Sequence, residues 1–198
     1  MMENAGHGLA DFIINRFKIK LKGMEILAIA GTGNNGGDSF VASRHLSGYY
    51  GAIVKVVLLG FPSELRTEEA KINWGIVEKM DSLETRFVNG IDDEIKKKIS
   101  KADIIIDGIF GTGIRGEIRE PHASIIEMIN KSKAYVVSVD IPSGIDPNTG
   151  KAHDRCVNAD ATVTFHRMKV GLLNNRKYCG KIHMEHIGIP LEAERGIV

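Results

Sequence analysis

The chain has few of the residues that mark a disulfide-bonded or zinc-binding protein. Its 198 residues include two cysteines, Cys156 and Cys179, which lie far apart and form no C-x-x-C motif. This pattern argues against a disulfide scaffold or a zinc site and is typical of proteins from a reducing cytoplasm. We therefore expect each thiol to be buried or incidental.

Excess charge, aromatic residues and long apolar runs are also scarce. The formal net charge is +1, from 26 Lys and Arg against 25 Asp and Glu, so no bulk attraction toward nucleic acid or a membrane surface is expected. Aromatic residues make up 6% of the chain, which leaves little for base stacking. No apolar run approaches the roughly 18 to 20 residues of a membrane span, and no signal peptide is recognisable. We expect a cytoplasmic protein whose partner is a small, specific ligand.

The chain does contain a regular alternation of apolar runs and amphipathic stretches. Short apolar runs predict strands at residues 24–31, 52–60, 85–90, 103–111, 134–142, 161–166 and 181–189. Amphipathic or charged stretches predict helices from Ala5 to about Gly23, from about Gly37 onward, and at residues 66–80, 92–102 and 123–131. This alternation predicts one α/β domain over residues 1–198, with a mostly parallel sheet and helices on both faces.

Three polar loops follow strong predicted strands, at residues 31–38, 107–115 and 140–148. In open α/β sheets, ligands bind at the carboxyl ends of the strands, where loops converge and helix N-termini present free N–H groups. These three loops are therefore the predicted site.

The first loop contains Gly31-x-Gly33-x-x-Gly36, the spacing of a turn that holds the pyrophosphate of a dinucleotide. By itself the spacing is a weak signal, and a tight turn without a ligand is the alternative. A redox-cofactor site also needs an acid at the end of the second strand, but residues 56–60 contain none. No His or Tyr proton donor is expected near the loops either, so an NAD-dependent dehydrogenase is disfavoured.

Polar side chains in the loops are candidates for binding. Asp38 is a candidate helix cap or ligand contact, and Asp140 either acts in the site or is a turn carboxylate. Asp107 interrupts an apolar strand, where a carboxylate is costly unless it is paired or binds a cation. Oxygen atoms of Asn35, Asp107 and Ser143 could together surround a monovalent or divalent cation.

Five sequence blocks occur in an order that resembles the YjeF N-terminal domain family, the NAD(P)H-hydrate epimerases. They run over nearly the whole chain and are MENAG (2–6), GTGNNGGDSFVASRHL (31–46), DGIFGTGIRGEIREP (107–121), VDIPSGIDPNTG (139–150) and NADATVTFHRMKVGLL (158–173). The resemblance implies a Rossmann-like three-layer α/β/α sandwich. It also implies a metabolite-repair isomerase that interconverts the R and S forms of NADHX and NADPHX, the hydrated nicotinamide dinucleotides. The dinucleotide is then the substrate, and a partner NAD(P)HX dehydratase uses the S form.

The resemblance also implies roles for individual residues. Asp140 would lie beside the reacting ring and is our choice for the acid and base, since epimerisation moves protons. Asn35, Asp107 and Ser143 match the potassium ligands of the family, with one K⁺ per subunit. The implied substrate contacts, besides Asp140, are Asn34, Asn35, Gly36, Gly37, Asp38, Gly111, Thr112, Gly113, Ile114, Arg115, Gly116 and Glu117.

Some features leave alternatives open. Arg115, Arg119 and Lys169 either hold phosphate groups or are structural or solvated cations. The chain ends without the kinase-like dehydratase domain that is fused to many relatives. We therefore expect either a separate dehydratase or an excised domain, and the family resemblance also implies a homodimer. A non-catalytic nucleotide-binding or scaffold module of the same fold is the alternative function, but the presence of Asn35, Asp107, Asp140 and Ser143 favours the enzyme.

Overall fold

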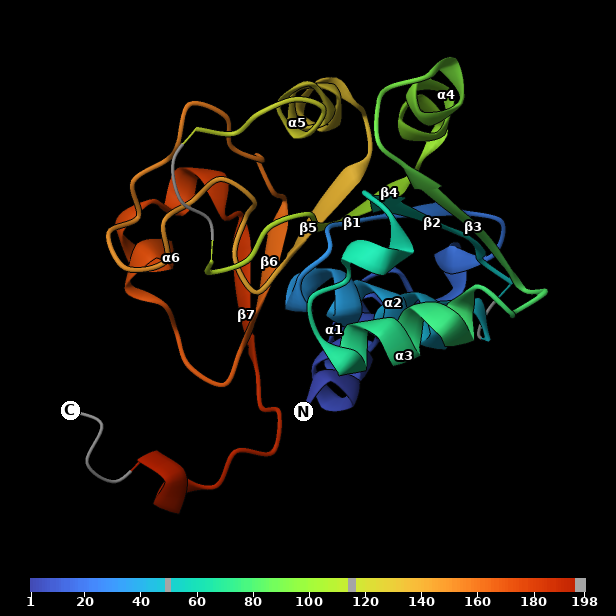
Figure 1. Cartoon of the computed structure of the whole chain (residues 1–198). Helices are drawn as coiled ribbons and strands as arrows, with labels where there is room; N and C mark the ends of the chain where they lie inside the picture. The colour runs from blue at the N-terminus through green and yellow to red at the C-terminus, as the bar shows by residue number, and fades with distance from the viewer. Residues whose placement is uncertain (49–50, 114–116, 195–198) are drawn as a thin grey trace.

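A seven-stranded sheet forms the centre of the molecule, in the order β3-β2-β1-β4-β5-β6-β7 (Figure 1). The computed structural model describes residues 1–48, 51–113 and 117–194. Every neighbouring pair of these strands is parallel, which confirms the predicted parallel α/β sheet. The strands are β1 (Glu25–Ala30), β2 (Ile53–Leu59), β3 (Leu83–Val88), β4 (Ile104–Gly108), β5 (Tyr135–Val139), β6 (Ala161–Phe165) and β7 (Lys181–Glu185).

Helices cover both faces of the sheet, as the sequence predicts. In Figure 1, α1, α2 and α3 lie on one side of the strands, and α4 and α5 lie on the other. The α-helices are α1 (Met2–Phe17), α2 (Asn34–Ser47), α3 (Glu68–Val77), α4 (Asp93–Lys101), α5 (His122–Lys131) and α6 (Val170–Asn174). Short 3-10 turns are η1 (Lys18–Leu21), η2 (Pro62–Glu64), η3 (Arg176–Tyr178) and η4 (Leu191–Glu194). Within the described residues, no helix is both long and apolar enough to cross a bilayer.

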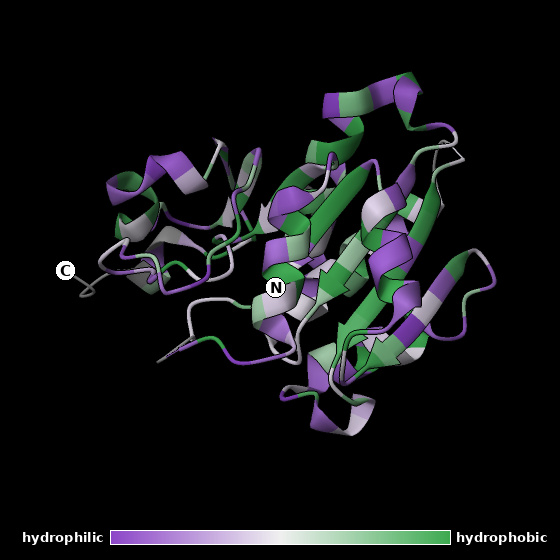
Figure 2. Cartoon of the chain, turned by 90° about the horizontal axis from the view of Figure 1, so that it is seen from above, coloured by the Kyte–Doolittle hydropathy of each residue, from purple (hydrophilic) through white to green (hydrophobic). Residues whose placement is uncertain are grey.

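The side chains of β1 show how the central strands hold the layers together. Ile26, Ala28 and Ala30 pack into the core beneath α1, α2 and α3, whereas Leu27 and Ile29 pack beneath α4 and α5. Because successive side chains of a strand point to opposite faces, a strand between two helical layers must be apolar at every position. Figure 2 shows the resulting, mostly hydrophobic strands between helices in which hydrophobic and hydrophilic residues alternate. The two cysteines are buried free thiols, as expected.

Two predicted helix boundaries were wrong. The first helix ends at Phe17 rather than near Gly23, because Lys18 has φ 51° and the chain continues as a 3-10 turn. The second begins at Asn34 rather than near Gly37, so the asparagines and glycines of the loop form its first turn. Asp38 therefore lies inside α2, so of its two candidate roles, helix cap or ligand contact, the helix cap is contradicted. The last predicted strand is also shorter, because β7 ends at Glu185.

Close backbone contacts allow α2 to start immediately after β1. A Cβ atom at Gly36 would lie 1.9 Å from the carbonyl oxygen of Gly31, and one at Gly31 would lie 2.0 Å from the carbonyl oxygen of Ile109. Real side chains cannot occupy such positions, so both residues must be glycine for the turn and the β4 loop to pack. These two glycines have a structural role in addition to any contact with a ligand.

We predict opposite effects of alanine at two helical glycines. Gly36→Ala should lower the free energy of unfolding by more than about 2 kcal/mol, because its Cβ would overlap a backbone atom that has no room to move. Gly75→Ala in α3 should raise it by about 0.5 to 1 kcal/mol, because a Cβ there meets no atom within 4 Å and alanine favours the helix. Urea unfolding measures both values, and equal effects at the two positions would contradict this account of the turn.

Candidate functional site

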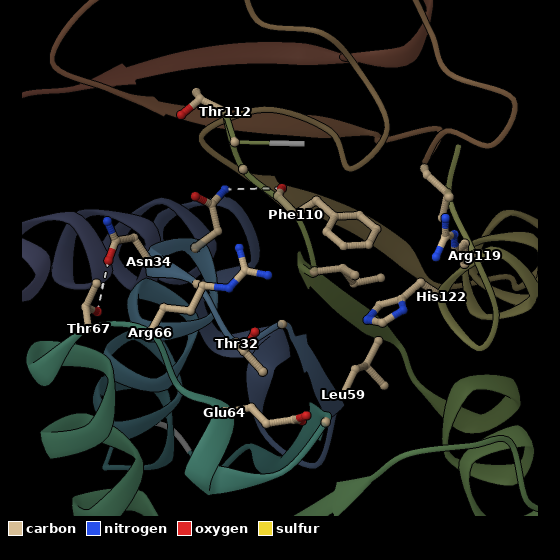
Figure 3. A pocket seen from close by; sticks show the side chains of 18 of the residues that line it. Thr32, Asn34, Leu59, Glu64, Arg66, Thr67, Phe110, Thr112, Arg119 and His122 are labelled. Atoms are coloured by element: carbon tan, nitrogen blue, oxygen red, sulfur yellow. Dashed lines mark hydrogen bonds between the residues drawn. The ribbon is translucent and has the colours of Figure 1, made fainter. Parts of the chain in front are cut away.

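A cavity of about 990 Å³ opens at the carboxyl ends of β1, β2 and β4 (Figure 3). It is lined by the loop 31–35 after β1, by residues between Leu59 and Thr67 after β2, and by residues 109–113 and 117–122 after β4. The strand order reverses between β1 and β4, since β2 and β3 lie on one side of β1 and the later strands on the other. Ligands of open α/β sheets bind at this switch point.

The N-terminus of α2 faces this cavity. Gly33 is the N-cap residue, and no side chain among the described residues caps the helix. A Cβ at Gly33 would meet nothing within 4 Å, so the backbone is open to the cavity at this point. Free N–H groups and the positive end of the helix dipole favour an anion. The first turn of α2 is therefore suited to a phosphate group.

The carboxylate of Asp107, at the end of β4, is completely buried and holds the neighbouring loops by hydrogen bonds. It accepts hydrogen bonds from the Ser143 hydroxyl (2.5 Å), the Ser143 backbone N–H (2.9 Å) and the Ser138 hydroxyl (2.8 Å). Burial raises the pKa of Asp107, and the hydrogen bonds from the two serines oppose that rise. A carboxylate inside an apolar strand is costly unless it is paired or binds a cation, and these hydrogen bonds pair Asp107.

Asn35 joins the same cluster through backbone carbonyl groups. Its side-chain nitrogen donates to the carbonyl oxygen of Val139 (2.5 Å) and lies 3.5 Å from that of Phe110. The Ser143 hydroxyl lies 3.3 Å from the same Phe110 oxygen and accepts a hydrogen bond from the Phe110 N–H (2.9 Å). Asn35, Asp107 and Ser143, the three predicted cation ligands, therefore meet around Phe110. Amide, carbonyl, hydroxyl and carboxylate oxygens are the donors that hard cations prefer.

Asp140 follows β5 in a strained backbone conformation. Its φ of 64° lies in the left-handed region, where Asp is tolerated better than most other residues. One carboxylate oxygen, Oδ1, accepts hydrogen bonds from the Phe165 N–H (2.9 Å) and the Thr164 hydroxyl (3.3 Å), and it contacts Lys169 Nζ. Lys169 also donates to the Phe165 carbonyl and the Thr164 hydroxyl. These contacts fix both the backbone and the carboxylate at the end of the strand.

Asp38 supplies a second carboxyl group near Asp140. The residue is 7% exposed, and its side chain forms no hydrogen bond with any residue that the structure describes. Burial and the charge of Asp140 raise the pKa of Asp38 to about 8, against the smaller opposite effects of Lys169 and the Met1 amino group. This rise favours the protonated form of Asp38 near neutral pH, close to the Asp140 side chain that contacts Lys169. Such a pair is typical of sites that exchange protons.

The sequence comparisons identify the family of this chain. Residues 1–171 match the model of the family described as YjeF-related protein N-terminus. The chain belongs to this family. The resemblance inferred from the five sequence blocks is therefore confirmed.

Relatives within the YjeF-related family are similar over the full length of the chain. It is 50% identical to the NAD(P)H-hydrate epimerase of Cenarchaeum symbiosum and 45% identical to that of Nitrosopumilus maritimus, covering all of this chain and 89% of each relative. It is also 47% identical to the bifunctional NAD(P)H-hydrate repair enzyme of Methanothermobacter thermautotrophicus. That match covers 98% of this chain but 37% of the larger protein.

The fold is also found in a solved structure. The yeast protein YNL200c superposes with a TM-score of 0.81 and 27% identity, over 96% of this chain and 79% of the yeast protein. This likeness confirms the three-layer α/β/α fold.

The residues implied by the family resemblance fall into three groups. Six line the cavity, namely Asn34, Asn35, Gly111, Thr112, Gly113 and Glu117. Others do not line it, namely Gly36, Gly37, Asp38, Asp107, Asp140 and Ser143. Ile114, Arg115 and Gly116 lie outside the described residues. Lys169 contacts Asp140 and does not line the cavity, whereas Arg119 does.

The cavity contains residues that the sequence did not predict. The expectation of no histidine near the loops was wrong, because His122 lines the cavity, with its ring centroid 4.9 Å from that of Phe110. Burial lowers the pKa of His122. Glu64 and Arg66 also line the cavity, from the segment after β2. No motif marked these residues, although Pro121 just before His122 is a signal for a helix start at the end of a loop.

We predict that replacing Asp38 changes how stability depends on pH. In the unfolded chain Asp38 ionises near its ordinary pKa of 3.8, whereas the folded protein keeps the proton until about pH 8. The unfolded state then binds fewer protons than the native state between these values, so this group lowers the free energy of unfolding as pH rises through that window. Asp38→Asn has no such group.

Urea unfolding of both proteins across this window tests the prediction. The stability of Asp38→Asn relative to the unmodified protein should increase from the acidic to the alkaline end. A difference that is constant with pH would show that Asp38 is ionised in the folded protein.

Proposed function

We propose that this protein epimerises the R and S forms of NADHX and NADPHX and so supplies the S form to a dehydratase. The observation that carries the proposal is the pair of carboxyl groups, Asp38 and Asp140, beside an open helix N-terminus at the strand switch point. Relatives at 45 to 50% identity that carry the name NAD(P)H-hydrate epimerase support it. The protein is an isomerase whose substrate is a damaged dinucleotide.

The edge of the sheet orients the substrate. The pyrophosphate lies at the first turn of α2, where Gly33 leaves the backbone open and Asn34 and Asn35 offer amide groups. The hydrated nicotinamide ring lies on the β5 side, next to Asp140. Gly111, Thr112, Gly113 and Glu117 line the cavity from the β4 side and contact the substrate there.

Asp140 is the proton acceptor and donor in this proposal. Epimerisation at the hydroxyl-bearing carbon needs either loss and return of the hydroxyl group or opening and closing of the ring, and both routes move protons. Lys169 is a positioning residue, because it holds Oδ1 of Asp140 in place. Asp38, which is protonated at neutral pH, can supply a proton while Asp140 accepts one.

Asn35, Asp107 and Ser143 hold one K⁺ per subunit in this proposal. The donor set fits the ion, because Asn35 and Ser143 offer neutral oxygens, Asp107 offers a carboxylate, and the Phe110 carbonyl oxygen lies 3.3 Å from the Ser143 hydroxyl. When bound, K⁺ would supply positive charge next to the loops after β4 and β5. Ser143 and Asp107 also position those loops through their own hydrogen bonds.

The setting of the reaction also belongs to the proposal. We place the protein in the cytoplasm as a homodimer, with the dehydratase on a separate chain or on another part of a longer one. Relatives described as bifunctional repair enzymes, of which this chain spans little more than a third, support this functional link.

The function is tested with purified protein and a single NADHX epimer. Chromatography should show conversion to the other epimer faster than the spontaneous reaction, and Asp140→Asn should slow the catalysed rate by about 100-fold or more. Asparagine is also tolerated in the left-handed region, so the backbone at this position is kept.

A matched control replaces an exposed acid that is remote from the cavity. Asp81→Asn removes the same charge and should leave the rate unchanged. No acceleration by the unmodified protein would defeat the enzyme and favour a non-catalytic binding module. Near-normal turnover by Asp140→Asn would instead remove Asp140 from the mechanism.

Potassium binding is tested by thermal stability, independently of activity. A ligand that binds only the folded state raises the melting temperature, so KCl should stabilise the protein more than LiCl at equal ionic strength. Ser143→Ala should lose most of this difference. Ser138→Ala removes another buried hydroxyl that donates to Asp107 but is outside the proposed ligand set, and it should keep the difference. Identical melting temperatures in the two salts would contradict the K⁺ site.

A further inference from the structure

An acidic side chain occupies the end of β2, although the strand itself ends without one. Glu64 belongs to the 3-10 turn η2, which follows β2, and its side chain lines the cavity together with Leu59 and Gly60. Figure 3 shows Glu64 near Leu59 and Thr32, at the opposite end of the view from Thr112. The turn therefore returns a carboxylate to the edge of the second strand.

The backbone holds the Glu64 carboxylate in place. Its Oε2 atom accepts a hydrogen bond of 2.8 Å from the N–H of Phe61. A Cβ at Gly60 would lie 2.8 Å from the same oxygen, so glycine at that position leaves room for the carboxylate. Within the part of the chain that the structure describes, Glu64 forms no ion pair, and Oε1 accepts no hydrogen bond. One oxygen is thus fixed by the protein and the other remains available to a ligand.

Hydrogen bonds connect the segment that carries Glu64 to the loop between β1 and α2. The N–H of Arg66 donates to the carbonyl oxygen of Thr32 (3.0 Å), and the Thr67 hydroxyl donates to the side-chain oxygen of Asn34 (3.0 Å). Because these bonds link the two loops, the distance from the helix N-terminus to the Glu64 carboxylate is set by the protein and not by the ligand. A dinucleotide with its pyrophosphate at α2 would therefore meet Glu64 in a defined place.

The proposed orientation of the substrate decides which half reaches Glu64. This step rests on the proposed function, in which the reacting ring lies near Asp140 on the β5 side and the pyrophosphate lies at α2. The other nucleoside must then extend over β2, on the opposite side of β1. In parallel α/β sheets, an acid at the end of the second strand accepts hydrogen bonds from the ribose hydroxyls of that nucleoside.

The geometry points to Glu64 as the residue that binds the adenosine ribose and selects NADHX over NADPHX. Its carboxylate accepts a hydrogen bond from the 2′-hydroxyl of NADHX. In NADPHX a phosphate replaces that hydroxyl, and the like charges repel each other. This selection concerns the half of the substrate that is remote from the reaction.

Arg66 does not neutralise Glu64. In Figure 3 its guanidinium group extends away from Glu64 toward the middle of the cavity and Phe110. Its side chain is exposed and makes no ion pair with Glu64. A 2′-phosphate at the end of β2 would thus meet a carboxylate first, whereas the arginine is directed toward the pyrophosphate.

Calorimetric binding of ADP-ribose and of 2′-phospho-ADP-ribose tests this proposal without the reacting ring. The unmodified protein should bind ADP-ribose at least about 10-fold more tightly, and Glu64→Gln should bring the two affinities close together. Glutamine can still accept the Phe61 hydrogen bond through its side-chain oxygen, so the turn and the melting temperature should be preserved. Glu68→Gln is the matched control, because Glu68 is an exposed acid on α3 that does not line the cavity, and it should keep the preference.

Three results would overturn the role of Glu64: equal or stronger binding of the 2′-phosphorylated compound by the unmodified protein, no binding of either compound, or an unchanged preference in Glu64→Gln. The NADHX conversion assay separates this proposal from the proposed function. Catalysed epimerisation with an unchanged Glu64→Gln preference would defeat only the ribose contact. A Glu64-dependent preference without epimerisation would defeat only the enzyme.

Discussion

The buried carboxylate of Asp107 is the interaction on which the rest of the site depends. An unpaired carboxylate with no exposed surface would strongly destabilise the fold, so its hydrogen bonds to Ser138 and Ser143 are obligatory. Those bonds tie the end of β4 to β5 and to the loop that follows it. Since Asp140 lies between the two serines in sequence, its position is determined by the same bonds.

The second constraint is the close packing of the turn between β1 and α2. Gly31 and Gly36 allow the helix to begin directly behind the strand, with backbone atoms of the turn and of the β4 loop in contact. As a result, Asn35 reaches the carbonyl groups of Phe110 and Val139, and the helix N-terminus opens into the cavity. One short turn thus places an open helix N-terminus next to a cluster of oxygen atoms. The helix N-terminus favours a negative charge, whereas the neighbouring oxygen atoms favour a positive one. This arrangement is suited to holding a charged ligand in one orientation.

The chemistry at the edge of the sheet changes from one strand to the next. Glu64 lies at β2, the open helix N-terminus follows β1, and the oxygen cluster lies at β4 and β5. Asp140, which follows β5, contacts Lys169, which follows β6, and its charge acts on Asp38 in α2. Burial is least at Glu64, which is exposed, and greatest at Asp38 and Asp107. The exposed carboxylate of Glu64 therefore lies at the open end and the buried acids at the enclosed end, where the low dielectric strengthens the electrostatic effect of one group on another.

The sequence alone determined the parallel α/β fold and the family, and two of its three predicted loops, 31–38 and 107–115, contribute residues to the cavity, whereas no residue of 140–148 lines it. It could do so because central strands of a parallel sheet are apolar throughout and because the carboxyl ends of such strands lie on one edge. The prediction that Asn35, Asp107 and Ser143 belong together follows from this rule, since each lies in a loop after a strand. The start of α2 was misplaced because glycines are unfavourable in an isolated helix, whereas here close packing compensates for them.

Only the tertiary structure decided how groups from separate segments face one another. Asp38 was interpretable as a cap or a ligand, but its burial beside Asp140 makes it a protonated acid. The end of β2 lacked an acid in sequence, yet η2 turns Glu64 back to that place. The position of His122 in the cavity was also not predicted, because no sequence motif includes this residue. Local sequence patterns determine which residues form a strand or a loop. The pKa of a side chain and its contacts with other segments depend instead on the distances and burial that long-range packing creates.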